Sequence, residues 1–274
     1  MPPAPKTEAL YSVTMSNPHP YLPPEILDQI VDLLHDNQET LLRCCLVSKS
    51  WAPRTRKHLF AHVEFKAEDY DRWMKAFPDP INSPAYHVHT LTVDGSLRGA
   101  QDSSWIQGFI RVERLIVDRE WTGSSVAPIS LLPFHRLASS LKALYVSLLF
   151  LPHTKIFDLV RSLTLLEDLT LNGEDADIDG DESVERQTIV SSTPLALTGT
   201  LELFLYARVG RTLRRLVDLP GGVHFRKIDL SWCGVQDLPQ VVEIVVACSD
   251  TLESIEIACK VDGTLVSLLA RIIA

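Results

Sequence analysis

From residue 86 onward the chain repeats a short pattern of apolar and polar positions. The unit is apolar-x-x-apolar-x-apolar, and its copies are VHTLTV (88–93), VERLIV (112–117), LKALYV (141–146), LEDLTL (166–171), a looser TGTLEL (198–203), FRKIDL (225–230) and LESIEI (252–257). The fourth positions are Leu91, Leu115, Leu144, Leu169, Leu201, Ile228 and Ile255, so successive copies are 24, 29, 25, 32, 27 and 27 residues apart. Alternation with a period of two predicts a short strand in each copy, with its apolar side chains on one face.

The segments between the copies show helical spacing of apolar residues in WIQGFI, ISLLPFHRLASS, TKIFDLVRSLT and LPQVVEIVVACS. A strand followed by a helix, repeated, predicts parallel strands joined by crossovers. The last segment, TLVSLLARIIA, is predicted to be a terminal helix that caps the array. An ordinary doubly wound α/β sheet is the competing architecture, although neither GxGxxG nor GxxxxGK[ST] occurs in the sequence.

The period and pattern resemble an irregular leucine-rich repeat. The copy FRKIDLSWCGV is the best one, because it also places Cys233 at the asparagine or cysteine position of that repeat. The other copies depart from it, with Ser96, Glu120, Leu149, Glu174 and Lys260 at the equivalent position. The fold class that we predict for this region is therefore an α/β solenoid.

The N-terminal part of the chain has a different, helical pattern. Residues 1–19 hold several prolines and no apolar periodicity, so we expect a disordered tail. Three short helices are predicted over 22–36, 37–47 and 48–60, and a further helix over 67–77. Three helices of this size bury little surface, so an apolar face is expected to remain after they pack together.

The motifs LPPEILDQIVDLL, LLRCCLVSKSW and HLFAHVEF, in this order, resemble an F-box. The domains predicted on this basis are a tail (1–19), an F-box (20–65), a helical linker (66–85) and a leucine-rich-repeat-like domain (86–274). By resemblance, the F-box docks on the Skp-family adaptor of an SCF-type ubiquitin ligase through apolar anchors. The matching positions are Leu22, Pro23, Pro24, Ile26, Leu27, Ile30, Leu46, Val47, Trp51 and Leu59.

In a repeat array the side chains between the inward apolar positions line one concave face, where a partner is expected to bind. Tyr145 and Ile116 are the predicted anchors, because desolvated aromatic and apolar side chains dominate interface energy. The substrate-binding residues predicted on this face are Ile116, Tyr145, Arg114, Lys142, Arg226 and Lys227.

Composition narrows the choice of function. The chain has 274 residues, 46% apolar and 22% charged, with 26 basic and 35 acidic side chains. This excludes disordered, collagenous and disulfide-rich proteins, and a net charge of −9 argues against nucleic acid as a partner. Seven acidic and no basic residues lie between 174 and 185, so the remainder of the chain carries a charge of only −2.

No membrane span or export signal is visible, and five cysteines without CxxC spacing are typical of reduced thiols. We therefore expect a cytoplasmic or nuclear protein. The tract DADIDGDESVER matches the first half of a calcium loop but has Arg186 where the bidentate glutamate is needed, so a solvated acidic loop is expected. His87 and His89 are predicted to share one strand face, a spacing that could supply half of a zinc site, but no third or fourth ligand is identifiable, so we expect surface histidines and no metal.

No catalytic motif or cofactor-binding loop is present in the sequence, so we predict neither an enzyme nor a cofactor. The function we predict is that of a substrate-recognition subunit of an SCF-type ubiquitin ligase, with the F-box on the adaptor and an unknown protein substrate on the repeats. The alternative is a repeat scaffold that binds a protein partner independently of any such ligase.

Overall fold

The computed structural model describes residues 22–66, 69–80, 82–94, 103–118, 131–151, 153–175, 197–205, 209–261 and 264–271. The predicted tail lies outside these ranges, and so does the acidic insertion apart from Glu174 and Asp175. The chain divides into two compact units, residues 1–55 and 56–274.

The first unit is helical. Helix α1 runs over Pro24–Leu33, α2 over Gln38–Val47, and α3, over Ala52–Leu59, begins in this unit and ends in the next. Pro24 opens α1, where a missing N–H costs no intrahelical hydrogen bond. Asn37 caps α2 by accepting a hydrogen bond from the backbone N–H of Thr40 at 2.9 Å. The three helices predicted in this part of the chain are confirmed.

The described residues of the second unit form a nine-stranded sheet in which the strands follow one another in chain order. The strands are β1 (His62–Phe65), β2 (Thr90–Asp94), β3 (Arg114–Asp118), β4 (Ala143–Leu151), β5 (Asp168–Asp175), β6 (Thr200–Leu205), β7 (Lys227–Cys233), β8 (Ser254–Val261) and β9 (Thr264–Arg271). All neighbours are parallel except β8 and β9. A doubly wound sheet reverses its strand order, so this alternative is excluded.

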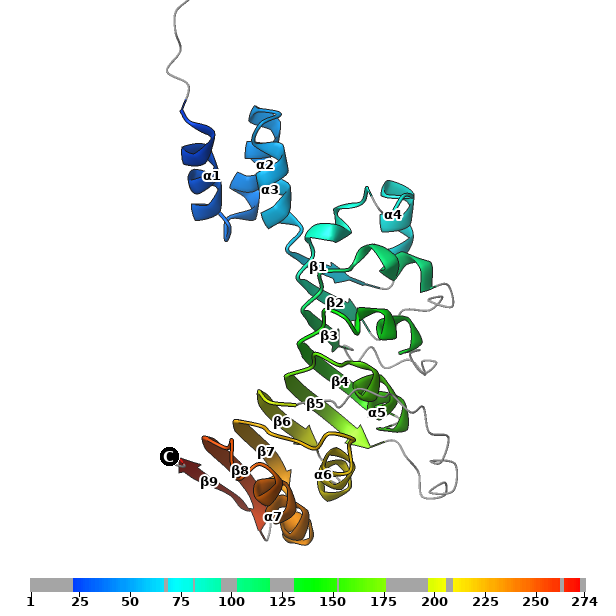
Figure 1. Cartoon of the computed structure of the whole chain (residues 1–274), viewed down its shortest axis with the longest axis vertical. Helices are drawn as coiled ribbons and strands as arrows, with labels where there is room; N and C mark the ends of the chain where they lie inside the picture. Colours follow the sequence, from blue (N-terminus) through cyan, green and yellow to red (C-terminus); the bar gives the residue numbers. More distant parts are fainter. Residues whose placement is uncertain are drawn as a thin grey trace, which may run out of the picture. The chain divides into compact units, whose positions relative to one another are not determined.

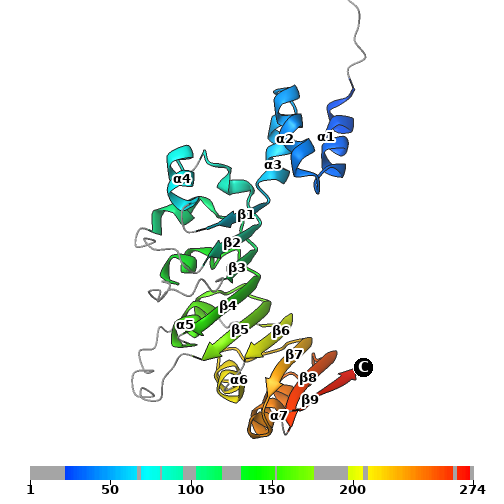
Figure 2. The same cartoon turned by 180° about the vertical axis from the view of Figure 1, so that it is seen from behind.

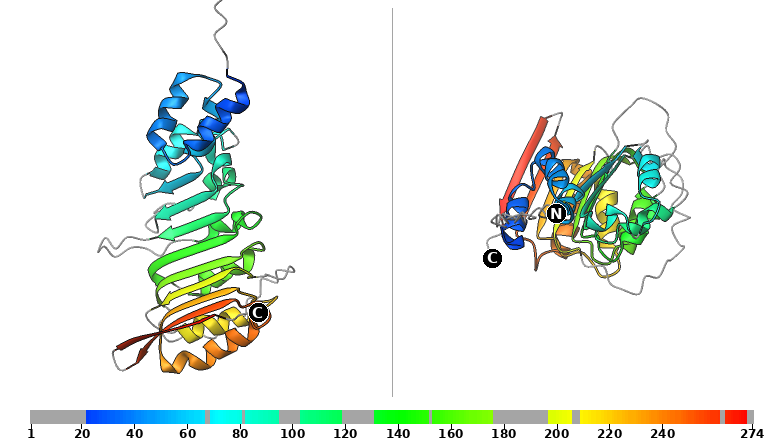
Figure 3. Two further views of the ribbon diagram at one scale, coloured as in Figure 1. Left: turned by 90° about the vertical axis from the view of Figure 1, so that its left-hand side faces the viewer. Right: turned by 90° about the horizontal axis from the view of Figure 1, so that it is seen from above.

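Helices and 3₁₀ turns connect the strands and lie on one face of the sheet (Figures 1 and 2). They are α4 (Asp69–Ala76), η1 (Pro84–His87), η2 (Ser103–Gly108), η3 (Leu132–Leu137), α5 (His153–Ser162), α6 (Val209–Val217), η4 (Val235–Asp237) and α7 (Leu238–Ala247). Helices were predicted at α4, α5 and α7, whereas the segments at η2 and η3 form 3₁₀ turns and α6 was not predicted. The left view of Figure 3 looks onto the opposite face of the sheet, which we call the open face.

The seven repeat copies form seven consecutive strands, β2 to β8, in the predicted register. Each fourth-position residue pairs with the next, from Leu91 with Leu115 through to Ile228 with Ile255. All seven of these side chains are buried, none being more than 7% exposed. Together with the apolar residues two positions further on, they make the core between the sheet and the connecting helices.

Strand β1, which was not predicted, adds one more strand beside β2, and Val63 pairs with Leu91. Phe65 of β1 lies edge-to-face with Trp73 of α4 at 5.3 Å and with Trp105 of η2 at 5.6 Å between ring centroids. It also lies edge-to-face with Phe109 at 5.9 Å. Edge-to-face ring pairs add to the free energy gained from burying aromatic area, so this cluster stabilises the β1 end of the core.

The predicted C-terminal helix is wrong, because residues 264–271 form strand β9. The strand pairs antiparallel with β8 over its full length, from Val261 with Thr264 to Ser254 with Arg271. The two residues between the strands are Asp262 and Gly263, a dipeptide typical of two-residue hairpins. A mostly apolar segment does not by itself distinguish a helix from a strand, whereas an Asp-Gly sequence before it favours a hairpin.

Replacement of Leu169, a fully buried member of the core ladder, tests the register. We expect Leu169→Ala to lower the free energy of unfolding by about 2–5 kcal/mol, because it removes buried methyl groups and leaves a cavity. Urea unfolding followed by circular dichroism measures this change. Leu165→Ala is the matched control, because the Leu165 side chain is 48% exposed and its loss should cost less than about 1 kcal/mol. Equal effects of the two substitutions would contradict the observed register.

Candidate protein-interaction surfaces

Apolar side chains remain exposed on the first two helices. On α1 these are Ile26, Ile30 and Leu33, spaced so that they share one helix face, and on α2 they are Leu42 and Leu46, one turn apart. Leu46 is 88% exposed and Leu33 83%. The small core of the unit is made instead by side chains such as those of Val31, Leu41 and Cys44. Exposed apolar side chains at helical spacing are typical of a surface that docks on a partner protein.

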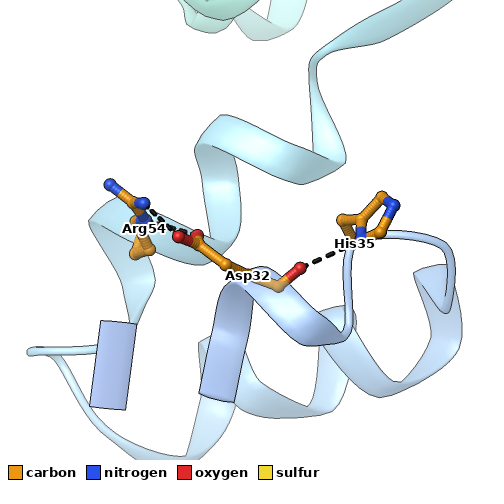
Figure 4. A network of polar contacts seen from close by, with 3 residues as sticks. All are labelled: Asp32, His35 and Arg54. Carbon is orange, nitrogen blue, oxygen red and sulfur yellow. Dashed lines mark hydrogen bonds and ion pairs between the residues drawn. The ribbon is translucent and has the colours of Figure 1, made fainter. Parts of the chain in front are cut away.

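A polar link holds α1 to α3. The Arg54 guanidinium donates from Nε to Asp32 Oδ1 at 2.6 Å and from a terminal nitrogen to the second carboxylate oxygen of Asp32 (Figure 4). These contacts raise the pKa of Arg54, so it stays charged. The imidazole Nδ1 of His35 lies 2.9 Å from the Asp32 carbonyl oxygen, one turn further along. A two-point contact of this kind fixes orientation as well as distance between the helices.

The predicted adaptor-binding residues fall into two groups in the structure. Exposed members lie at the start of α1, along it, or at the end of α2, and they are Leu22, Pro23, Pro24, Ile26, Ile30, Leu46 and Val47. Leu27, Trp51 and Leu59 are half-buried. Seven of the ten side chains are therefore exposed, while the other three also contribute to packing within the chain. Leu33 and Leu42 were not predicted, although both are exposed and apolar.

The N-terminal helices match a known protein family. The family model described as F-box-like matches residues 19–65, which include all three helices and β1. This chain contains an F-box-like domain. No curated protein and no solved structure matches the chain. The F-box match supports a role with SCF-type ubiquitin ligases in general terms, since F-box domains typically bind Skp-family adaptors.

The open face of the sheet carries the second surface. Side chains that alternate with the core ladder pair across neighbouring strands and form what we call the middle row: Glu64, Thr92, Ile116, Tyr145, Thr170, Glu202, Asp229 and Glu256. The predicted anchors Ile116 and Tyr145 are thus direct neighbours, and both are half-buried. An apolar pair in the middle of an otherwise polar row is the expected arrangement for anchoring a partner.

The last three described members of the middle row are acidic. Glu202, Asp229 and Glu256 stand on the adjacent strands β6, β7 and β8. Burial, followed by repulsion from Glu256 and Glu202, raises the pKa of Asp229. Glu202 accepts a hydrogen bond from the Thr170 hydroxyl at 3.0 Å. The row therefore changes from apolar at β3 and β4 to strongly negative at β6 to β8.

Of the four basic residues predicted for substrate binding, two form ion pairs with neighbouring glutamates and two are exposed on strands. Lys142 Nζ lies 3.5 Å from Glu113, and a terminal guanidinium nitrogen of Arg226 lies 3.9 Å from Glu253. Both pairs sit just before the strands. Arg114 and Lys227 are exposed at the first position of β3 and β7. Glu202 was missed by the sequence analysis because its repeat copy, TGTLEL, is the loose one.

The expectation that His87 and His89 share a strand face is wrong. His87 ends the 3₁₀ turn η1 and His89 precedes β2, so the two residues do not share a strand face. Burial, together with the nearby charges of Arg111 and Lys57, lowers the pKa of His87. In the described ranges no group of three or more possible ligands could hold a metal ion. The calcium-like tract lies outside those ranges, except that Asp175 ends strand β5.

Two further features bear on the predicted chemistry. All five cysteines are free thiols, and burial raises the pKa of Cys233 to about 12, which keeps this thiol protonated.

Among the described residues, no helix has the length and apolar character needed to cross a bilayer.

Loss of the Arg54 contact should loosen α1. We expect Arg54→Met to weaken the F-box unit by about 0.5–1 kcal/mol, the upper range for a partly exposed ion pair, since the methionine keeps the apolar stem. Hydrogen exchange of the α1 amides should become about 2–5-fold faster. In the control Arg43→Met, which removes an exposed pair with Glu39 within α2, α1 exchange should not change. Equal exchange in both variants would show that the Asp32 contact does not hold the helices.

Removal of one charge from the acidic end should stabilise the sheet. Because the pKa of Asp229 is raised in the folded protein, protonation of this carboxyl stabilises the fold. This stabilisation is lost as pH rises through the folded-state pKa. We expect Asp229→Asn to raise the free energy of unfolding at pH 7 by about 0.5 kcal/mol, the size of a cross-strand charge repulsion. The difference should shrink as pH falls toward about 4. Thermal unfolding at both pH values measures it, and a less stable variant at pH 7 would contradict the assignment.

Proposed function

We propose that this chain is a non-catalytic substrate-recognition subunit of an SCF-type ubiquitin ligase, acting in the cytoplasm or nucleus. In this proposal the exposed apolar residues of α1 and α2 dock on the Skp-family adaptor. The sheet unit, an irregular leucine-rich-repeat array, holds a protein substrate on its open face. The chain then contributes to ubiquitin transfer by proximity, since a bound substrate is presented to the catalytic subunits at high effective concentration.

The observation that carries the adaptor role is the exposure of apolar side chains in a domain that matches the F-box model. Leu46 and Val47 end α2 at 88% and 71% exposure, and Ile26 and Ile30 line one side of α1. Exposed apolar area of this kind is costly in water unless a partner covers it. A bound adaptor would remove that cost, which supports docking as the role of these helices.

The repeat assignment is supported by the seven copies that pair in register and by the placement of the connectors on one face of the sheet. Repeat arrays present one side of a sheet as an extended binding surface, because each strand adds one more row of side chains. The half-buried pair Ile116 and Tyr145 on the open face supports protein binding there.

Co-purification with the adaptor tests the docking role. The chain is co-expressed with a Skp-family adaptor, and the amount of adaptor retained is compared between the unmutated chain and the variant Ile30→Glu, Leu46→Glu. We expect stoichiometric retention by the unmutated chain and at least a tenfold loss in the variant, because two charges would be buried without partners.

The control for this experiment is Val242→Glu, which places the same charge on an exposed position of α7, at 61% exposure, outside the residues that match the F-box model. It should retain the adaptor fully. All three proteins should keep the same unfolding temperature within about 2 °C, since the altered side chains are exposed. If the unmutated chain retains no adaptor, the proposal fails and the remaining role is that of a scaffold independent of the ligase.

A further inference from the structure

We propose that the open face selects an extended, basic segment of its protein partner. The segment would lie across strands β3 to β8, with an apolar side chain on Ile116 and Tyr145 and Lys or Arg side chains over Glu202, Asp229 and Glu256. This inference rests on the proposed function, since it names the class of substrate that the open face would hold.

The first argument is the cost of the acidic arrangement. Glu202 pairs with Asp229, and Asp229 pairs with Glu256, so three carboxylates lie on directly neighbouring strands. Like charges at directly opposed positions of a sheet destabilise it. Burial of the central carboxylate adds to that cost, as the raised pKa of Asp229 indicates. A bound cation would turn this repulsion into attraction.

The second argument is that the described residues leave these charges uncompensated. No ion pair joins Glu202, Asp229 or Glu256 to a cation in the part of the chain that the structure describes. The nearby acidic residues Glu113 and Glu253 do have basic partners. Glu202, Asp229 and Glu256 are therefore open to a cation from outside.

The spacing of the carboxylates favours a chain of cations over a single ion. Neighbouring strands lie about 4.8 Å apart, so Glu202 and Glu256 are separated by about 10 Å, too far for both to bind one metal ion. No metal-holding group is found among the described residues, in agreement with this distance. Two basic side chains two residues apart on an extended peptide are about 6.6 Å apart and can each reach two of the three carboxylates.

The position of the apolar pair sets the spacing within the partner. Tyr145 on β4 and Asp229 on β7 are three strands apart in the middle row, or about 14 Å. An extended chain covers that distance in four to five residues. Phe204, half-buried at the end of the same face of β6, adds a second aromatic contact beside the acidic residues. The partner segment is thus an apolar residue followed four to five residues away by paired Lys or Arg.

Peptide selection tests this specificity without knowledge of the natural substrate. A display library of random 12-residue peptides is selected on the purified 274-residue chain, and the enriched peptides are sequenced. We expect enrichment of two or more Lys or Arg with an apolar residue four to five positions away. Selection on Asp229→Asn, Glu256→Gln should lose the basic enrichment. Enrichment of acidic or uncharged peptides, or no enrichment above background, would overturn the inference.

A binding measurement on the best basic peptide gives the size of the effect. By fluorescence polarisation, the variant Asp229→Asn, Glu256→Gln should bind at least tenfold more weakly, and affinity should fall as salt rises from 50 to about 200 mM. Tyr145→Ala should also weaken binding, through the apolar contact. The control Glu243→Gln, Asp250→Asn removes two exposed charges from α7 and the turn after it, and should bind like the unmutated chain. Equal loss in this control would overturn the inference, because net charge alone would then explain binding.

Failure of this inference differs from failure of the proposed function. A chain that retains the Skp-family adaptor but enriches no basic peptides has the adaptor role without this specificity. A chain that enriches basic peptides on the open face but retains no adaptor has the specificity without the ligase. Thermal unfolding provides a third test. The variant Asp229→Asn should bind the basic peptide more weakly and yet unfold at a higher temperature. A misfolded variant would show the opposite shift in temperature.

Discussion

The sheet unit depends on one buried ladder, in which Leu or Ile from each repeat packs directly against the same position of the next repeat. Parallel pairing places side chains of one register position on the same face, so a single row from Leu91 to Ile255 fixes the relation of seven strands. A shift of one residue in any strand would turn its leucine to solvent. The apolar free energy that holds the core therefore also specifies the register.

The same constraint creates the open face, because the side-chain period of a strand is two. Once the ladder is buried, the residue after each ladder position must point away from the helices. Ile116 and Tyr145, 29 residues apart in sequence, become neighbours in this way, and so do Glu202, Asp229 and Glu256 at intervals of 27. The residue types on the open face are thus set at positions that the core does not use.

The sequence predicts most of this sheet because the repeat pattern and the register have the same cause. What it missed has specific physical reasons. Strand β1 is only four residues long and lies within the F-box match, so its two alternate apolar residues, Val63 and Phe65, were not counted as a repeat. Strand β9 lies in a mostly apolar segment, TLVSLLARIIA, in which a period of two is not visible. The acidic end of the middle row needs the register of three distant segments, which no local pattern reports.

The F-box unit obeys a different constraint, since three short helices enclose few side chains. Its apolar anchors could be named from the motif, but whether each is exposed could not, because one helix face serves both packing and docking. Val31 is buried while Ile30 beside it is exposed, a division set by how α1 packs and by the contact of Asp32 with Arg54. The apolar surface that the unit cannot bury alone is the same surface that a partner would cover. In a unit of this size the small core explains both the marginal packing and the apolar surface that is left for a partner to cover.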